Sequence, residues 1–312
     1  MAFADMDVDT IWMDGEFVDW EDAQVHVLTH SLHYGTGVFE GVRCYDTERG
    51  PAIFRWEEHL DRLYDSARPL DHDIDYSREE LTEATVELIR RQDLQSCYIR
   101  PLVFYGYNSL GVSPKDCPTR TMVACWPWGA YLGEEALEEG VDVMVSSWRK
   151  HSSSQIPTNV KATGPYINSM LAGEEARENG YVEAIVLNKE GNVAEGPGEN
   201  LFVVKDGEIY TPGLAQSILD GITRKTAITL AEELGYEVHD EAVISRGQLY
   251  TADELFFTGT AAEVTPIRTV DDTRIGAGTR GPVTEEIQSA FFDLVERGTD
   301  DHDDWFTYVE ER

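Results

Sequence analysis

The chain has 312 residues, of which 41% are hydrophobic and 10% aromatic, so it can bury the cores of about two globular domains. Its 59 acidic and 25 basic side chains leave a formal net charge of −34, spread along the whole chain. A surface this acidic repels nucleic acid and anionic membranes, so neither is an expected partner.

The chain contains six lysines, and we interpret their scarcity, together with the acidic excess, as adaptation to a high-salt cytoplasm. The acidic N-terminal residues and the lack of any run near about 18 apolar residues predict a cytoplasmic protein without a signal peptide or membrane span. Cys44, Cys97, Cys117 and Cys125 form no CxxC pair, so we expect reduced and buried thiols.

Taken in chain order, the first part of the sequence alternates short apolar runs with two amphipathic helices. Strands are predicted at residues 11–13, 16–18, 38–45, 52–55, 98–105 and 121–126. One helix is predicted at residues 56–67. A second helix begins at the capping box of Ser77 and Glu80 and ends at Arg91. The pattern indicates a small α+β domain over residues 1–127.

Residues 128–140, which end in a Gly- and Glu-rich stretch, form the expected connector between domains. Residues 141–312 are then predicted to form a larger, mixed α/β domain. Its strands are expected at residues 141–147, 184–187, 201–205 and 208–210, and its helices at 167–178, 224–234 and 283–296. The order of these strands stays open.

Three patterns match known signatures only in part. They are the glycines at 276, 278 and 281, the histidines at 26, 30 and 33, and the serines at 152–154. The glycines have dinucleotide-loop spacing, but the chain nearly ends before a βαβ unit could follow. The histidines lack a metal-binding HExxH pattern, and the serines lack a GxSxG frame. We therefore predict neither a metal nor a serine nucleophile.

Lys161 stands between a turn and the start of an apolar helix, whereas the other five lysines fall in charged or turn-like stretches. A lysine in apolar surroundings can lose its proton and attack a carbonyl group, which is the chemistry of a Schiff base. From the residues alone, Lys161 fits either that role or an ordinary surface lysine.

Three further stretches could bind an anionic ligand. A glycine-rich bend begins at Glu195 and enters an apolar strand. Residues 219–224 open a helix, whose unpaired N–H groups and the Thr223 hydroxyl could hold a phosphate. Residues 259–262 form a second turn of glycine and hydroxyl residues. Each alone is usually only a turn or a cap.

Together and in this order, the motifs resemble the fold-type IV pyridoxal phosphate (PLP) enzymes, and most closely the branched-chain amino acid aminotransferases. The matching stretches are HYGTGVFEGVRCY at 33–45, EEHLDRL at 57–63, YIRPLVF at 98–104, WPWGAYLG at 126–133, KATGPYINSML at 161–171, EGPGENLF at 195–202, LDGITR at 219–224 and FTGTAAEVTPI at 257–267. The resemblance implies an α/β chain with the D-amino acid aminotransferase-like architecture.

The resemblance also implies how the cofactor is bound. Lys161 would hold PLP as an internal aldimine and then shuttle a proton, and Glu195 would pair with the pyridine nitrogen. Tyr166 would hydrogen-bond the phenolic oxygen of the ring. Four residues, Arg62, Ile222, Thr223 and Thr260, would bind the phosphate through one guanidinium and backbone N–H groups. The remaining cofactor-binding residues would be Leu219 and Gly221.

The substrate pocket implied by the resemblance has apolar walls and one cation. Its residues would be Tyr34, Phe39, Gly41, Tyr98, Arg100, Trp128, Tyr131, Thr260, Ala261 and Ala262. Arg100 would receive the second carboxylate of glutamate or 2-oxoglutarate. Pro165 departs from the asparagine often found at its position in this family, which leaves the local loop geometry open.

We therefore predict transamination between L-leucine, L-isoleucine or L-valine and 2-oxoglutarate, by a ping-pong mechanism in a homodimer or larger homo-oligomer. Within the same fold, D-amino acid aminotransferase and 4-amino-4-deoxychorismate lyase are the alternatives, and an amino-donor panel separates them. A non-catalytic acidic binding protein is the alternative from another class. Intact Lys161, Glu195, Tyr166 and Arg62 argue against it.

Overall fold

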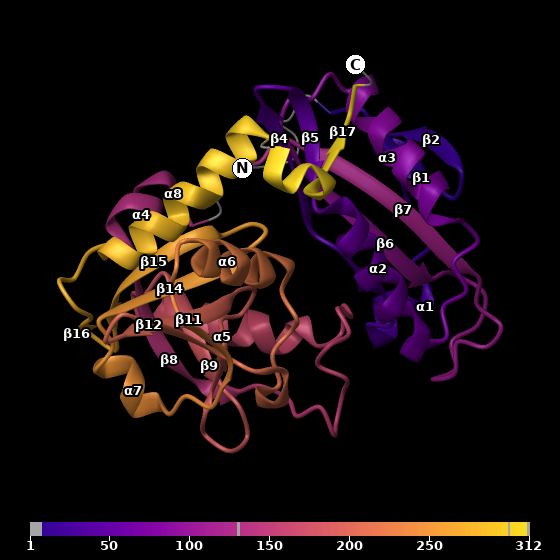
Figure 1. Cartoon of the computed structure of the whole chain (residues 1–312). Helices are drawn as coiled ribbons and strands as arrows, with labels where there is room; N and C mark the ends of the chain where they lie inside the picture. The colour runs from indigo at the N-terminus through magenta and orange to yellow at the C-terminus, as the bar shows by residue number, and fades with distance from the viewer. Residues whose placement is uncertain (1–7, 130–131, 299, 311–312) are drawn as a thin grey trace. The chain divides into compact units, whose positions relative to one another are not determined.

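The structure is a computed structural model that describes residues 8–129, 132–298 and 300–310 (Figure 1). The chain divides into two compact units. Unit 1 comprises Met1–Trp128, Val160–Gly164 and Val295–Arg312, and unit 2 comprises Gly129–Asn159 and Pro165–Leu294. Among the described residues, no helix is both long and apolar enough to cross a membrane.

Unit 1 is built on an eight-stranded sheet with the order β17-β5-β4-β6-β7-β1-β2, to which β3 adds by pairing with β6. The strands are β1 (Thr10–Met13), β2 (Glu16–Asp19), β3 (Val38–Phe39), β4 (Val42–Thr47), β5 (Gly50–Phe54), β6 (Cys97–Tyr105), β7 (Thr119–Trp126) and β17 (Phe306–Tyr308). Its helices are α1 (His30–Tyr34), α2 (Trp56–Ala67) and α3 (Arg78–Arg91). Each strand in this sheet runs antiparallel to its neighbours.

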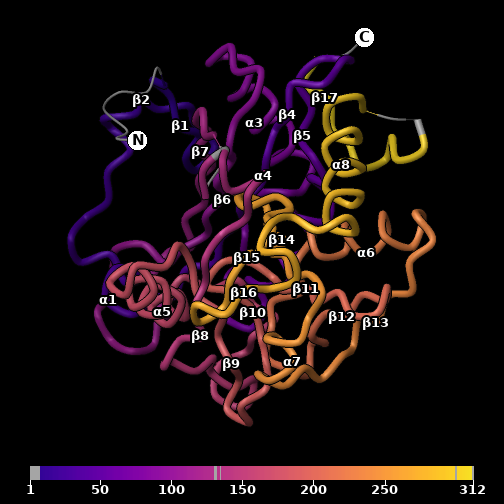
Figure 2. Tube along the Cα trace, turned by 90° about the vertical axis from the view of Figure 1, so that its left-hand side faces the viewer, coloured from indigo at the N-terminus to yellow at the C-terminus, as the bar shows by residue number. Residues whose placement is uncertain are grey.

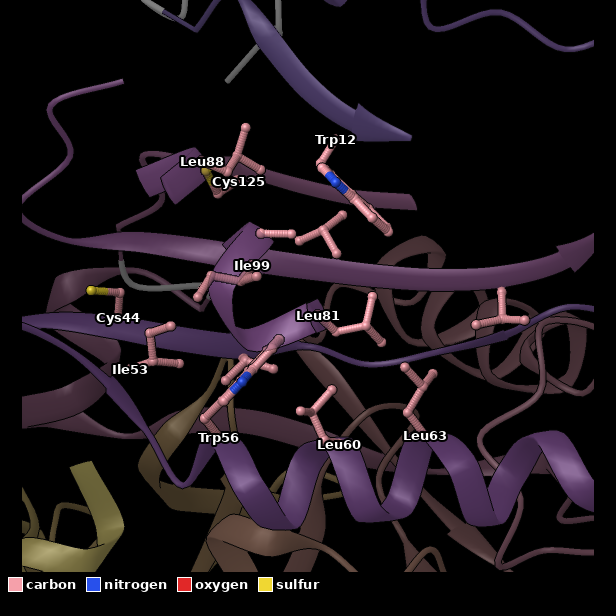
Figure 3. Packing of buried hydrophobic residues seen from close by; sticks show 14 of the residues in the cluster. Trp12, Cys44, Ile53, Trp56, Leu60, Leu63, Leu81, Leu88, Ile99 and Cys125 are labelled. Atoms are coloured by element: carbon pink, nitrogen blue, oxygen red, sulfur yellow. The ribbon is translucent and has the colours of Figure 1, made fainter. Parts of the chain in front are cut away.

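The core of unit 1 lies between this sheet and helices α2 and α3. Trp56, Leu60 and Leu63 recur at helical spacing along α2 and are buried. Figure 3 shows them pointing from the helix toward Ile53 and Ile99 on the sheet. Burying an aliphatic or aromatic side chain of this kind stabilises the fold by roughly 1.5–3 kcal/mol each.

Helix α3 begins at the predicted capping box. The Glu80 amide donates to Ser77 Oγ (3.2 Å), and the Ser77 amide donates to Glu80 Oε2 (2.8 Å). Two backbone N–H groups that the first turn cannot satisfy internally are thereby paired, which places the start of the helix at Arg78.

The strand predicted at 38–45 is divided in the structure, and that part of the prediction is wrong. β3 ends at Phe39, and β4 begins at Val42. At the break, the Glu40 amide donates to the Pro101 carbonyl (2.9 Å) while its side chain turns toward helix α2. Glu40 is as buried at this break as its apolar neighbours Val38 and Phe39.

Unit 2 is built on a nine-stranded mixed sheet with the order β10-β9-β8-β15-β14-β11-β12-β13, to which β16 adds by pairing with β15. The strands are β8 (Val141–Arg149), β9 (Glu183–Leu187), β10 (Val193–Glu195), β11 (Asn200–Lys205), β12 (Glu208–Pro212), β13 (Val238–Ala242), β14 (Glu254–Gly259), β15 (Glu263–Val270) and β16 (Thr273–Arg274). Three pairs are parallel: β8 with β9, β8 with β15, and β12 with β13. Strands β12 and β13 lie side by side in Figure 2. The helices are α4 (Glu134–Glu139), α5 (Tyr166–Glu178), α6 (Ile222–Glu233), α7 (Arg246–Tyr250) and α8 (Pro282–Arg297).

The division of the chain differs from the sequence-based one of 1–127, 128–140 and 141–312 at three places. Residues 129–140, expected to form a connector, belong to unit 2, where α4 packs against β15. Residues 160–164 belong to unit 1 because Ala162 forms a β-bridge with Val38. The end of the chain also joins unit 1, since β17 pairs with β5 in the register Thr307 to Ile53. Both pairings join segments far apart in the sequence, and neither leaves a local signal.

The four cysteines are buried and unpaired by disulfides, as expected from their spacing. Cys44 and Cys97 face each other across β4 and β6. Contact with the Cys125 and Cys44 thiols, together with burial, raises the pKa of Cys97 well above its usual value, so its thiol stays protonated.

Candidate active site

Lys161 lies beside β3 and is held in place through its backbone. Its carbonyl accepts from the Phe39 amide (3.1 Å), and its own amide donates to Ser66 Oγ on α2 (3.0 Å). The Nζ atom lies 4.9 Å from the centroid of the Phe39 ring. The main chain of Lys161 is therefore anchored on two sides while its amine faces an aromatic surface.

Burial lowers the pKa of the Lys161 ammonium to about 8, and the neighbouring positive charge of Arg62 acts in the same direction. Glu40 and Tyr98 oppose this shift, whereas Arg100 adds to it. An amine with a pKa near 8 is partly uncharged at neutral pH, and the uncharged form is the nucleophile and proton acceptor. An amine of this kind suits the Schiff-base role that the sequence left open.

A buried carboxylate, Glu40, pairs with two side chains on helix α2. Its Oε1 accepts from Arg62 Nε (2.7 Å) and its Oε2 from Arg62 Nη2 (2.8 Å), while His59 Nδ1 lies 2.7 Å from Oε2. Burial raises the pKa of the Glu40 carboxyl, but the charge and hydrogen bond of Arg62 and the hydrogen bond of His59 bring it well below its usual range. Glu40 is therefore ionised.

Sequence analysis missed Glu40 and His59. A signal exists for both: Glu40 is the charged residue inside the apolar FEG stretch, and His59 precedes Arg62 by three residues, which puts them on one helix face.

The substrate-pocket residues Phe39, Gly41, Tyr98, Arg100 and Trp128 come together in unit 1. The Arg100 guanidinium lies 4.8 Å from the centroid of Phe39, and its Nη2 donates to the Tyr98 hydroxyl (3.0 Å). The ring of Tyr98 meets that of Trp128 edge-on at 4.5 Å between centroids. A Cβ atom on Gly41 would lie 2.0 Å from the Tyr98 hydroxyl, so only glycine leaves room there. Among the described residues, Arg100 Nε is buried without a hydrogen-bond partner.

One predicted substrate residue of unit 1, Tyr34, is not part of this group. Tyr34 ends helix α1, stacks near His30 and donates its hydroxyl to the Leu110 carbonyl (3.3 Å). It is 42% exposed, so its surroundings are those of a surface residue in this chain. Tyr131 lies outside the described residues.

In unit 2, Glu195 ends β10 and is held by three groups. Its Oε2 accepts from the Leu219 amide (2.9 Å) and from Asn200 Nδ2 (3.2 Å), and its Oε1 forms an ion pair with Lys150. The sequence did not single out Lys150, but its side chain is only 12% exposed and is directed at Glu195. The residues next to Lys150 in the sequence, Trp148 and Arg149, do not indicate a partner as distant as Glu195.

Helix α6 opens beside the same network. Asn200 Nδ2 also donates to the Leu219 carbonyl (3.0 Å), which ties the loop before the helix to β11. Gly221 is the N-cap residue, and a Cβ there would lie 1.9 Å from Asn200 Oδ1. Ile222 and Thr223 are buried in the first turn, where backbone N–H groups lack helical acceptors.

The remaining predicted residues of unit 2 lie at other element ends. Residues 260–262 form the turn between β14 and β15, and Thr265 Oγ1 donates to the Ala262 carbonyl (2.6 Å), which braces the turn. Tyr166 is partly buried at the first position of α5. Pro165 stands at the N-cap of that helix with helical backbone angles, so it starts the helix without disturbing it.

The histidines singled out above make protein contacts. The two ring nitrogens of His30 lie 3.0 Å from Thr36 Oγ1 and 2.9 Å from the Gly111 carbonyl. Among the described residues, one group has donor atoms close enough for a metal, namely Glu208, Glu237 and His239 on or beside β12 and β13. The expectation that the protein needs no metal stays a prediction.

These side chains match what PLP requires of a protein. An amine with a lowered pKa suits an aldehyde, and a buried carboxylate suits a ring nitrogen that must stay protonated. A guanidinium and the opening turn of a helix suit a phosphate. Lys161, Glu195, Arg62 and the start of α6 supply these groups in turn.

Residues 37–270 match the family described as amino-transferase class IV. The chain belongs to the class IV amino-transferase family. The branched-chain-amino-acid aminotransferase of Pseudomonas aeruginosa is 54% identical over 99% of this chain and 100% of that protein. The enzyme of that name from Escherichia coli K12 is 52% identical over 96% of this chain and 97% of that protein.

Solved structures match the fold of this class IV aminotransferase over nearly its whole length. A crystal structure of the Escherichia coli branched-chain amino acid aminotransferase has a TM-score of 0.95 at 52% identity, and the match covers 97% of this chain and 100% of that chain. The T.th. branched-chain amino acid aminotransferase with pyridoxamine 5'-phosphate has a TM-score of 0.93 at 48% identity, covering 97% of this chain and 99% of that chain.

The sequence-based predictions of the family, the fold-type IV architecture and a PLP-dependent branched-chain amino acid aminotransferase are confirmed by these comparisons.

Proposed function

We propose that this class IV aminotransferase moves the amino group between L-leucine, L-isoleucine or L-valine and 2-oxoglutarate, in two half-reactions that share one active site. The observation that carries the proposal is the Lys161 amine. Burial lowers its pKa to about 8, and both this amine and the Arg100 guanidinium lie over the Phe39 ring. The kinship with enzymes named for branched-chain amino acids supports the substrate class.

The proposal assigns the cofactor to the residues that the family resemblance implies. When bound, PLP supplies an electron sink that makes the hydrogen on the substrate Cα acidic. Lys161 holds the cofactor and then moves the proton at Cα, and its lowered pKa suits that exchange near neutral pH. Glu195 keeps the pyridine nitrogen protonated. Tyr166 hydrogen-bonds the phenolic oxygen.

The phosphate is assigned to Arg62 and to the opening of helix α6. Arg62 supplies a fixed positive charge, and Ile222 and Thr223 supply N–H groups at the positive end of a helix. Thr260 completes this set as predicted from the family, and Leu219 and Gly221 are the other predicted cofactor-binding residues. Leu219 is bonded to Glu195, so one short loop links the residue for the ring nitrogen with those for the phosphate.

The substrate assignment rests on the mixed character of the pocket residues. Phe39, Tyr98 and Trp128 offer aromatic surface to a branched aliphatic side chain. Arg100 has a buried Nε atom with no partner among the described residues, which suits a carboxylate. The same residues can thus accept an apolar substrate and an acidic one. Gly41, Thr260, Ala261 and Ala262 complete the proposed pocket, and Tyr34 and Tyr131 remain assigned to it by resemblance.

The proposal is tested with an amino-donor panel on the holoenzyme. L-Leucine, L-isoleucine and L-valine with 2-oxoglutarate should all form glutamate, whereas D-alanine should not. Turnover that is fast with D-alanine and slow with L-leucine would point to the D-amino acid aminotransferase alternative. Pyruvate release from 4-amino-4-deoxychorismate would point to the lyase.

Replacing Arg100 with methionine is expected to separate the two half-reactions. Leucine has one carboxylate and should react within a few-fold of the wild-type rate. Glutamate should lose a charge-assisted pair worth about 1.5–3 kcal/mol, or roughly 10- to 150-fold in rate. Single-turnover kinetics with each amino acid measures the two losses. Arg120→Met is the control, since Arg120 lies on the adjacent strand β7 and pairs with Asp14. Equal losses for both amino acids would reassign Arg100 to the α-carboxylate or to the fold.

We further propose a homodimer, because unit 1 carries an exposed apolar surface. Its residues, all more than a third exposed, are Val25, Val27, Leu28, Leu32, Tyr34, Tyr107, Leu110 and Val112. These residues fall in two stretches of the chain, 25–34 and 107–112. The stretches meet where the ring centroids of His26 and Tyr107 lie 4.1 Å apart. A largely apolar cavity of about 320 Å³ adjoins them and is lined in part by Val25 and Leu32. Apolar patches of this kind mark protein interfaces.

The cytoplasmic location expected from the sequence stays a prediction.

Activity and dimer formation are both expected to rise between dilute buffer and molar salt. Two subunits with a formal charge of −34 each must approach one another, and the screening length falls from about 10 Å at 0.1 M to about 3 Å at 1 M salt. Sedimentation and turnover measured across a potassium chloride series provide the check. A dimer that is complete and fully active in dilute buffer would contradict the high-salt adaptation.

A further inference from the structure

Glu40 is an ionised carboxylate that the reaction chemistry does not use and that solvent does not reach. It stands at the break between β3 and β4. In an uninterrupted strand, successive side chains would point to opposite faces of the sheet. A buried carboxylate is costly unless charged and hydrogen-bonding partners compensate it. The chain accepts that cost at a position next to the substrate-pocket residues Phe39 and Gly41, which suggests a role in the site.

The contacts of Glu40 fix the orientation of one guanidinium group. Arg62 donates through both Nε (2.7 Å) and Nη2 (2.8 Å), one to each carboxylate oxygen. Two parallel bonds between planar groups define the plane of the guanidinium as well as its position, which a single bond would not do. The Arg62 side chain is only 13% exposed, so water screens the attraction between its guanidinium and the Glu40 carboxylate only weakly.

His59 holds the carboxylate from the other side. Burial lowers the pKa of His59, which keeps its ring neutral at pH 7, and the Nδ1–H tautomer donates to Glu40 Oε2 (2.7 Å). The ring therefore orients Glu40 without adding charge. The charged groups that act on Glu40 and His59 from outside the pair are Arg62 and Lys161. Tyr98 and Arg100 act in turn on Lys161.

We propose that Glu40 is a positioning residue that orients Arg62 for the cofactor phosphate and offsets the positive charge of Arg62 beside Lys161. The inference rests on the proposed cofactor roles of those two residues. Without the carboxylate, Arg62 and Lys161 would confront each other as two cations in a partly buried setting, and the guanidinium would lose its fixed plane.

The first test is Glu40→Gln in the cofactor-free protein. A glutamine amide has one oxygen and one NH₂ group, so it cannot offer Arg62 the two acceptor oxygens of the present bidentate pair. Because Glu40 raises the pKa of Lys161, its loss should lower that pKa further. The labelling rate of the Lys161 amine by acetic anhydride, followed across pH by mass spectrometry, should then show a lower midpoint in the variant. An unchanged midpoint would overturn the charge-offset role.

The second readout is the affinity for PLP, measured by equilibrium dialysis. Glu40→Gln should weaken binding about tenfold or more, since a charge-assisted pair no longer orients Arg62. Glu58→Gln is the matched control. Glu58 lies on the same helix and pairs with an arginine, Arg55, but its side chain is 37% exposed. The control should change neither the Lys161 midpoint nor PLP affinity.

A double variant separates positioning from general structural support. If Glu40 acts through Arg62, then adding Glu40→Gln to Arg62→Met should cause no further loss of PLP affinity. A further loss of about tenfold in that background would overturn the proposal. Removing both charges also avoids an unpaired buried cation, so this comparison remains possible if Glu40→Gln alone does not fold. Should PLP prove not to attach to Lys161 at all, the proposed function fails, while the Lys161 midpoint still tests Glu40.

Discussion

Lys161→Ala is expected to abolish transamination. Alanine removes the amine that the proposal assigns to both cofactor attachment and proton movement, and that amine is the one placed over the Phe39 ring. Turnover of L-leucine with 2-oxoglutarate should fall to the background rate of the assay. Lys189→Ala is the control, since Lys189 is exposed and pairs only loosely with Glu190 (3.5 Å), and it should keep wild-type activity.

Borohydride reduction of the wild-type holoenzyme identifies the lysine directly. A phosphopyridoxyl group should appear on the peptide that contains Lys161. Lys150 is the serious rival, because its side chain is placed against a predicted cofactor residue, Glu195. Label on the Lys150 peptide would contradict the assignment even if Lys161→Ala were inactive.

Glu195→Gln is expected to retain PLP and lose most of its activity. The amide oxygen can still accept from the Leu219 amide and Asn200, so the loop before α6 should keep its place. A neutral amide cannot keep a pyridine nitrogen protonated, and electrostatic losses of this kind cost about 10²–10³ in rate. Stopped-flow kinetics and cofactor content measure the two properties separately. Glu190→Gln, an exposed neighbour, is the matched control. Near-normal turnover would reduce Glu195 to a turn residue.

The elements that could be predicted are those whose signal is local. Helix α3 begins and ends at the predicted residues because Ser77 and Glu80 cap it and its apolar residues repeat along one face. Strands such as β10, with three residues, and β16, with two, were missed because so short a run has no measurable period. β13 was missed for another reason: its residues are mostly polar, as suits a half-exposed edge strand.

The site could be predicted only as far as the resemblance to a known family extends. The motifs singled out Lys161, and the structure adds the low-polarity surroundings that lower its pKa. It could not be foreseen that Lys161 packs with unit 1, since the bridge from Ala162 to Val38 joins segments far apart in the sequence. The same is true of the pairs Glu40 with Arg62 and Glu195 with Lys150, because a charged residue carries no mark of its distant partner.

The pairing of β17 with β5 has a consequence for how the protein is made. β5 ends at Phe54 and leaves the ribosome early, but its edge partner begins only at Phe306. At about 5–20 residues per second, the edge of β5 waits roughly ten to fifty seconds for β17. During that interval the nascent chain presents an unpaired strand edge, on which a neighbouring chain on the same messenger RNA can add.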